Sequence, residues 1–180
     1  DASQPAAVRA SCPPLPPHYV PRQDAVDGLK QLIFEVEAPS DTPACNPRRV
    51  GVHGMAGSGK TVTALALSYD QEIRRRFTDG VVWIRLGKQA QSHEVLIRQS
   101  QVAEFFGEHA IVIADAEQGR SHLCTLLADK ACLLIVDDVW QAIDVTALDI
   151  LGPNGCMLIT TRDREILRSC AAREFSLPDL

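Results

Sequence analysis

The residues of this sequence with the clearest chemical potential form one uninterrupted run, GMAGSGKT, at positions 54–61. The run fits the pattern G-x-x-x-x-G-K-[ST], in which glycines let backbone N–H groups converge on an anion. Lys60 adds a full positive charge for the terminal phosphates of a nucleotide, and the Thr61 hydroxyl can ligate Mg²⁺. The apolar residues 50–52 predict a strand before the run, and residues 62–65 predict a helix after it. This context predicts a phosphate-binding loop that opens into a helix N-terminus.

Two further apolar strands end in polar residues that suit the same chemistry. The strand at 133–138 ends in two carboxylates, Asp137 and Asp138. Beside a phosphate loop, the first carboxylate would hold the metal, directly or through water, and the second would orient or deprotonate an attacking water. Arg162 follows another apolar strand and would contact a γ-phosphate. We therefore expect catalytic roles for Asp138, Asp137 and Arg162, and a metal site formed by Thr61 and Asp137.

The pattern of apolar residues predicts the elements that bring these side chains together. Short runs rich in Val, Ile and Leu alternate with stretches of helical periodicity, and no internal repeat is present. Such alternation predicts an α/β fold, in which a parallel sheet is covered by helices on both faces. Residues 109–114 fit either a short strand or more helix. We expect strands at 49–53, 80–86, 132–139, 156–161 and 173–177, and helices at 23–37, 59–69, 92–106 and 117–129.

The N-terminal part of the chain is rich in proline, with six of the eleven prolines among the first 21 residues. Proline fixes φ and lacks the N–H group that a helix needs, so residues 1–17 are predicted to form an extended arm. The next unit, 18–47, contains an amphipathic helix and then a loop broken by three prolines. Residues 48–180 form the phosphate-binding domain.

The overall composition excludes several classes of protein. A chain of 180 residues with 46% apolar and 23% charged residues suits one globular domain. The net charge of −5 disfavours a broad basic face for nucleic acid, and the arginines at 74–76 are expected to complement the C-terminus of the phosphate-loop helix instead. No apolar stretch approaches the roughly 18 residues that span a bilayer, and no signal peptide is visible. The six scattered cysteines predict reduced thiols, and the start at Asp1 indicates a piece of a longer protein.

Together these motifs resemble the NB-ARC class of STAND nucleotide switches, a family that contains the apoptotic protease-activating factor and plant NLR resistance proteins. The resemblance implies a three-layer P-loop NTPase of the ASCE type, whose five-stranded parallel sheet has the strand order 2-3-4-1-5. It also implies that ADP or ATP binds with Mg²⁺ at the C-terminal edge of this sheet. The resemblance extends from about His18 to Leu177 and is carried by HGMAGSGKT at 53–61, GVVWIRLGKQ at 80–89, LLIVDDVW at 133–140 and LITTRD at 158–163.

The resemblance also assigns single residues to the nucleotide. Tyr19-Val20-Pro21-Arg22 corresponds to the family's linker motif, whose backbone and arginine hold the adenine end, and Pro21 stands where the family often has glycine. The carboxylates and Arg162 keep the roles given above, with Arg162 as the sensor of the γ-phosphate. The expected nucleotide-binding residues are Val20, Arg22, Gly54, Ala56, Gly57, Ser58, Gly59, Lys60, Thr61 and Val62.

The function that the resemblance implies is a cytoplasmic regulatory switch with slow, Mg²⁺-dependent ATP hydrolysis. ADP favours a closed monomer, and exchange for ATP permits assembly of a homo-oligomer in cell-death or immune signalling. The chain ends at Leu180, before the helical and winged-helix domains that bury ADP in this family. Those domains are therefore expected partners, whereas nucleic acid and a membrane span are not.

Other P-loop proteins remain as alternatives. A small-molecule kinase needs a lid that carries arginines, which residues 107–130 do not obviously supply, and other ASCE ATPases share the same loop. A GTPase would need an Asn-Lys-x-Asp motif, which this sequence lacks. A nucleic-acid motor would need interleaved basic and aromatic side chains, which this acidic sequence does not offer.

Overall fold

Five parallel strands form the central sheet of the computed structural model, which describes residues 8–35, 48–88, 92–109 and 111–177. All four pairs of neighbouring strands are parallel, and the order across the sheet is β2-β3-β4-β1-β5. The predicted fold class and strand order are therefore confirmed. The strands are β1 (Arg48–His53), β2 (Gly80–Arg85), β3 (Cys132–Val139), β4 (Cys156–Thr161) and β5 (Arg173–Ser176).

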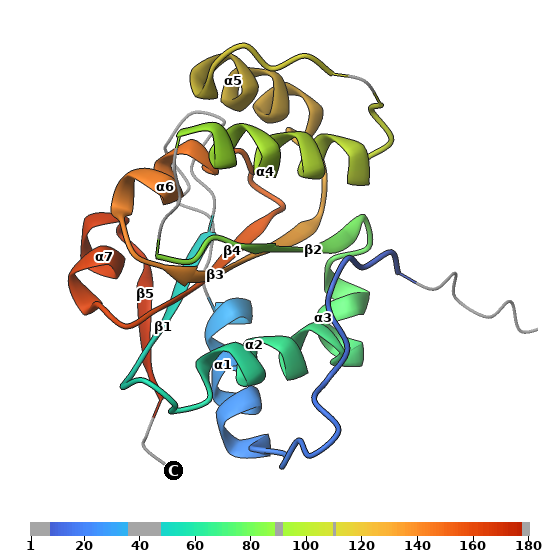
Figure 1. Ribbon diagram of the computed structural model, residues 1–180. Coiled ribbons are helices and arrows are strands. Elements are labelled where there is room, and N and C mark those ends of the chain that lie inside the picture. Colours follow the sequence, from blue (N-terminus) through green and yellow to red (C-terminus); the bar gives the residue numbers. More distant parts are fainter. Residues whose placement is uncertain (1–7, 36–47, 89–91, 110, 178–180) are drawn as a thin grey trace, which may run out of the picture.

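Helices cover both faces of this sheet and make three layers (Figure 1). One face is covered by α1 (Gln23–Glu35), α2 (Lys60–Ser68) and α3 (Gln71–Arg76). The opposite face is covered by α4 (Ser92–Phe105), α5 (Ala116–Leu126), α6 (Ala142–Ala147) and α7 (Arg164–Ser169).

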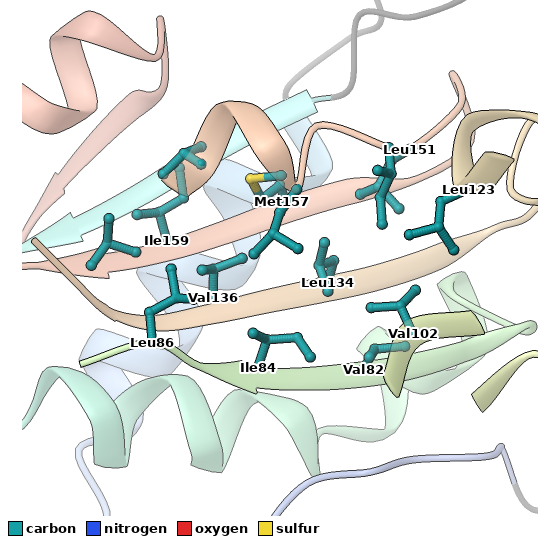
Figure 2. Close-up of a cluster of buried hydrophobic side chains, with 14 of the residues drawn as sticks. Val82, Ile84, Leu86, Val102, Leu123, Leu134, Val136, Leu151, Met157 and Ile159 are labelled. Carbon is teal, nitrogen blue, oxygen red and sulfur yellow. The ribbon is translucent and has the colours of Figure 1, made fainter. Parts of the chain in front are cut away.

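The strands are apolar on both sides because each face of the sheet has its own hydrophobic core. In β3, Leu133 and Ile135 pack against the α1–α3 layer, whereas Leu134 and Val136 pack against the other layer. Figure 2 shows this second core, in which Leu134 and Val136 lie between side chains of β2 and β4. Gly51 of β1 lets α7 approach closely, since a Cβ atom there would lie 2.3 Å from Leu167 Cδ2.

Several details differ from the sequence-based prediction. Three six-residue helices, α3, α6 and α7, were not predicted, because each is too short to show a helical period. The arginines at 74–76 lie in the last turn of α3, so they do not follow the phosphate-loop helix directly, which ends at Ser68. α5 ends at Leu126, three residues before its predicted end, and residues 109 and 111–114 form neither a strand nor a helix.

The described part of the proline-rich arm, residues 8–17, has no helix, as predicted, and it runs beside the outermost strand β2 (Figure 1, dark blue). Ala10 bridges to Val81 in parallel orientation, and Ser11 N donates a hydrogen bond of 3.0 Å to Val81 O. Trp83 N donates to Ser11 Oγ at 2.9 Å, and the Tyr69 hydroxyl donates to Pro13 O at 2.9 Å. Residues 1–7 of the arm, the end of the predicted helix at 36–37 and the loop with Pro39, Pro43 and Pro47 lie outside the described residues.

The cysteines behave as expected for small hydrophobic residues. Cys132 and Cys156 are buried in the two cores, where burial raises the pKa of each thiol to about 12. The five described cysteines are free thiols, and Cys45 lies outside the described residues. Within the described segments, no helix combines the length and the apolar character needed to cross a membrane.

Candidate functional site

The loop between β1 and α2 has the backbone conformation that the glycine-rich motif predicts. Gly57 and Gly59 have φ values of 81° and 89°, a left-handed region that side chains with a Cβ atom rarely adopt. The left-handed Gly59 directly precedes Lys60, the first residue of α2. The N–H groups in the first turn of an α-helix have no partner within the helix, so they are free to receive an anion.

The Lys60 ammonium lies at the base of this loop. Its Nζ donates hydrogen bonds to Gly54 O at 2.8 Å and to Met55 O at 2.7 Å. Burial lowers the pKa of Lys60, and the nearby Arg162 guanidinium lowers it further, whereas Asp138 and Asp137 act in the opposite direction. The loop thus holds a buried cation in one position through its own carbonyl groups.

Asp137 at the end of β3 connects the loop to the sheet. Its side chain is 0% exposed, and its Oδ1 accepts hydrogen bonds from Thr61 Oγ1 at 2.8 Å and from Thr160 Oγ1 at 2.7 Å. Its Oδ2 is buried and has no hydrogen-bond donor among the described residues; the closest cation is Arg85, whose Nε lies 3.9 Å away. A buried carboxylate oxygen without a donor, beside a threonine hydroxyl, fits the oxygen ligands that Mg²⁺ prefers.

Asp138 occupies an irregular position in β3. Its φ is 58°, and the pairing of β3 with β4 shifts register between Val136 and Val139. The Asp138 N–H donates to Thr160 Oγ1 at 2.9 Å. In a regular strand, successive side chains point to opposite faces of the sheet. The bulge breaks this alternation, which explains how two adjacent carboxylates can both lie near the phosphate-binding loop.

A cavity of about 270 Å³ opens above these groups; we call it the loop compartment. Arg162 reaches it from the end of β4, and its guanidinium carbon lies 5.1 Å from the centre of the Trp140 ring. Three charged side chains, those of Lys60, Asp138 and Arg162, therefore line this compartment. The lining residues are Gly57, Gly59, Lys60, Thr61, Val62, Asp138, Thr160 and Arg162.

A second cavity of about 330 Å³, the linker compartment, lies next to the first. Both cavities are lined by Gly57, Gly59 and Val62, so they flank the same loop. Arg22 fixes the position of the linker segment, because its Nη1 donates to Ser58 O at 3.0 Å. The lining is mainly apolar and consists of Pro16, His18, Tyr19, Val20, Arg22, Gly57, Gly59, Val62 and Thr63.

Most of the residues predicted for the site line one of these compartments. Four do not: Gly54 and Ser58 contribute their carbonyl oxygens to Lys60 and Arg22, Asp137 lies beneath the loop, and Ala56 is exposed within it. Thr160 was not assigned a role from the sequence, although a polar residue at the end of a buried strand is a usable signal. Pro16 and His18 were also missed, because only the folded arm brings them to the linker compartment.

Comparison with known proteins agrees with this geometry. The crystal structure of Cdc6p from Pyrobaculum aerophilum is similar in fold, with a TM-score of 0.59 and 16% identity over 91% of this chain and 48% of that chain. Human apoptotic protease-activating factor 1 is 28% identical over 173 residues, which cover 92% of this chain and 13% of that protein. A relative from Arabidopsis thaliana named as a probable disease resistance protein is 33% identical over 138 residues, which cover 73% of this chain and 7% of that protein.

The chain therefore spans only a small part of the length of these curated relatives. The family model of the NB-ARC domain matches residues 32–178, which include both the loop and the strands that carry the carboxylates and Arg162. The chain belongs to the NB-ARC domain family and has the fold of a P-loop ATPase.

Proposed function

We propose that this domain binds ADP and ATP together with Mg²⁺ and serves as the nucleotide switch of a larger signalling protein. The observation that carries this proposal is the pairing of two compartments on one loop. The loop compartment offers a buried cation, free N–H groups and the carboxylate of Asp138, whereas the linker compartment is mainly apolar. This division matches a nucleotide, which has a charged phosphate end and a flat, largely apolar base.

In the proposed complex, the phosphates lie over residues 57–62. Lys60 and the loop N–H groups neutralise the β-phosphate and γ-phosphate, and Val20 and Arg22 hold the adenine end. Thr61 and Asp137 hold Mg²⁺, and the unpartnered Asp137 Oδ2 supports this assignment. When bound, the metal supplies positive charge that offsets the charge on the phosphate oxygens.

Hydrolysis in this proposal depends on Asp138 and Arg162. The Asp138 carboxylate lines the loop compartment, where it orients an attacking water or accepts its proton. Arg162 lines the same compartment and senses whether a γ-phosphate is present. Turnover is expected to be slow, because a switch requires a long-lived ATP state.

The switch itself involves parts of the protein beyond this chain. We propose that helical and winged-helix domains close over ADP in a monomer, and that ATP favours a homo-oligomer. The relatives, an apoptotic protease-activating factor and probable disease resistance proteins, support a role in cell-death or immune signalling. A cytoplasmic location is part of this proposal.

The small-molecule kinase has less support as an alternative. Among the described residues, the lining of both compartments includes none from 107–130, the segment that would need to supply a lid with arginines. An acceptor screen separates the two functions. ATP consumption should stay slow whatever small-molecule acceptor is present, and rapid transfer to any acceptor would favour the kinase.

The nucleotide assignment has a direct test. Purified protein is denatured with acid, and the released nucleotide is identified by anion exchange. Protein freed of nucleotide is then titrated with ADP and GDP in the presence and absence of Mg²⁺. We expect adenine nucleotide in the supernatant or a dissociation constant for ADP in the micromolar range or tighter. Guanine nucleotide, or no binding of ADP, would contradict the proposal.

A further inference from the structure

Trp140 directly follows β3, and its ring contacts one cation beyond each of the two neighbouring strands, β2 and β4. The Arg162 guanidinium carbon lies 5.1 Å from the centre of the Trp140 ring, and Lys88 Nζ lies 5.4 Å from it. Lys88 follows β2, Trp140 follows β3 and Arg162 follows β4. These distances lie within the range of cation–π contacts.

Neither cation is within ion-pair distance of a carboxylate in the described part of the chain. This distinguishes Arg162 from Arg164 and Arg168, which both contact Glu174. A carboxylate partner would neutralise the charge of a guanidinium and occupy its N–H donors. An aromatic ring attracts the cation through its π-face and leaves those donors available.

Arg162 also reaches the loop compartment, so its position relative to Lys60 matters. Both side chains line that cavity, together with the carboxylate of Asp138. Two cations that face the same cavity repel each other when no anion is bound. Asp138 offsets part of this repulsion, and the Trp140 ring gives Arg162 an uncharged contact beside these charged side chains.

We propose that Trp140 is the positioning residue for Arg162, and that its ring keeps the guanidinium and its N–H donors ready for the γ-phosphate of ATP. This inference rests on the proposed function as an adenine-nucleotide switch. Trp140 does not line the loop compartment, so it acts only through Arg162. Its removal should therefore weaken the recognition of ATP more than the recognition of ADP.

The first test compares the affinities for ADP and for the β,γ-imido analogue of ATP, measured by calorimetry with Mg²⁺. We expect Trp140→Leu to weaken binding of the imido analogue about threefold to fivefold relative to ADP, which corresponds to the loss of one partly exposed cation–π contact. Trp140→Phe retains an aromatic face and should restore most of this ratio. An unchanged ratio in Trp140→Leu, or an equal loss for both nucleotides, would overturn the proposal.

Tyr69 provides a matched control, because Arg74 lies 5.0 Å from the centre of its ring. This pair lies beyond the last residue of α2, at the opposite end of the helix from the phosphate-binding loop. Tyr69→Leu removes a cation–π contact of the same kind, together with the hydrogen bond from the Tyr69 hydroxyl to Pro13 O, and should leave the ratio of the two affinities unchanged. A similar change in both variants would attribute the effect to general stability and would contradict the proposal.

The second test uses Trp140 as its own reporter. The chain has two tryptophans, so Trp83→Phe leaves Trp140 as the only one. In that background we expect the emission of Trp140 to change when the imido analogue binds and to change much less with ADP, because only the γ-phosphate engages Arg162. The response should vanish in Arg162→Gln and persist in Lys88→Gln. A response of equal size with ADP, or one that survives Arg162→Gln, would overturn the proposal.

The two tests also separate this inference from the proposed function. If the wild-type chain binds neither nucleotide, the nucleotide switch is wrong and the role of Trp140 falls with it. If the wild-type chain binds both nucleotides and Trp140→Leu does not change their ratio, the switch stands and only the role of Trp140 is wrong.

Discussion

The loop compartment and the linker compartment share one loop, but they are built in different ways. The loop compartment is formed by the loop after β1, by the ends of β3 and β4 and by the start of α2, and a chain of hydrogen bonds joins Thr61, Asp137 and Thr160. The linker compartment is formed by residues 16–22, which precede α1 and have no regular structure apart from a turn. The fold therefore determines the first compartment, whereas the second depends on how one irregular segment packs.

This difference predicts two kinds of response to mutation. The Asp137 side chain is completely buried, so changes in its neighbourhood affect a fixed polar network. Val20 is 77% exposed, so the linker residues have few contacts to lose in the free protein. We expect substitutions in the loop compartment to abolish a function and substitutions in the linker compartment to weaken binding by degrees.

The largest effect is expected from Lys60→Ala. At an ADP concentration of one hundred times Kd, bound ADP stabilises the wild-type domain by about 2.7 kcal/mol, which raises Tm by roughly 5–10 °C. Without the buried ammonium this shift should disappear, as measured by differential scanning fluorimetry. Circular dichroism of the unliganded variant controls for folding, and a normal ADP-dependent shift would show that the phosphates bind elsewhere.

Substitutions of Asp138 separate charge from backbone conformation. Asn adopts a positive φ at least as readily as Asp does, whereas Ala adopts it only at a cost, as Ala171 does with a φ of 51°. Both Asp138→Asn and Asp138→Ala should lower ATP hydrolysis at least about a hundredfold if the carboxylate acts on water. Asp138→Ala alone should also lose about 1 kcal/mol of unfolding free energy, measured with urea. Equal stability of the two variants would mean that the bulge does not depend on Asp138.

Arg22→Ala is expected to have an intermediate effect. It removes the hydrogen bond from Arg22 Nη1 to Ser58 O, and a bond from a charged group contributes about 1.5–3 kcal/mol. Because Arg22 is only partly buried, we expect about a tenfold increase in the Kd for ADP. Arg75→Ala removes an exposed charge on α3 and serves as the control. Complete loss of binding in Arg22→Ala would erase the distinction between the two compartments.

The smallest effect is expected from Val20→Ala. A bound base would bury part of the exposed Val20 side chain, so the loss of its methyl groups should raise the Kd for ADP about threefold. The unfolding free energy without ligand should not change. Val112→Ala is a matched control, because Val112 is 87% exposed and lines neither compartment. A change in Val112→Ala of the same size would remove the argument for a base contact.

The sequence predicted the loop compartment in most respects because its residues are local in the chain or lie at strand ends. The run at 54–61 contains both the left-handed glycines and Lys60. The order of the strands then brings Asp137, Asp138 and Arg162 to the same edge. The bulge at Asp138 could not be predicted, because the residue type alone does not reveal a positive φ.

Other features escaped prediction because they depend on contacts far apart in sequence or on very short elements. The linker compartment forms only when residues 16–22 pack against Thr63 of α2, and no local sequence pattern predicts this contact. The helices α3 and α7 have six residues each, too few for a period. Their starts were nevertheless visible, since Asp70 and Asp163 each precede the helix and accept N–H bonds as N-caps.

The arm that pairs with β2 also covers part of an edge of the sheet that could otherwise pair with a strand of another molecule. The outermost strands of an open sheet present unpaired N–H and C=O groups that can recruit a strand from another molecule and start aggregation. At Val81 and Trp83 the arm already occupies these groups, through Ser11 and Arg9. The opposite edge strand, β5, has only four residues and offers little length for such pairing. The same proline-rich segment that leads to the linker compartment thus opposes intermolecular strand pairing at this edge of the sheet.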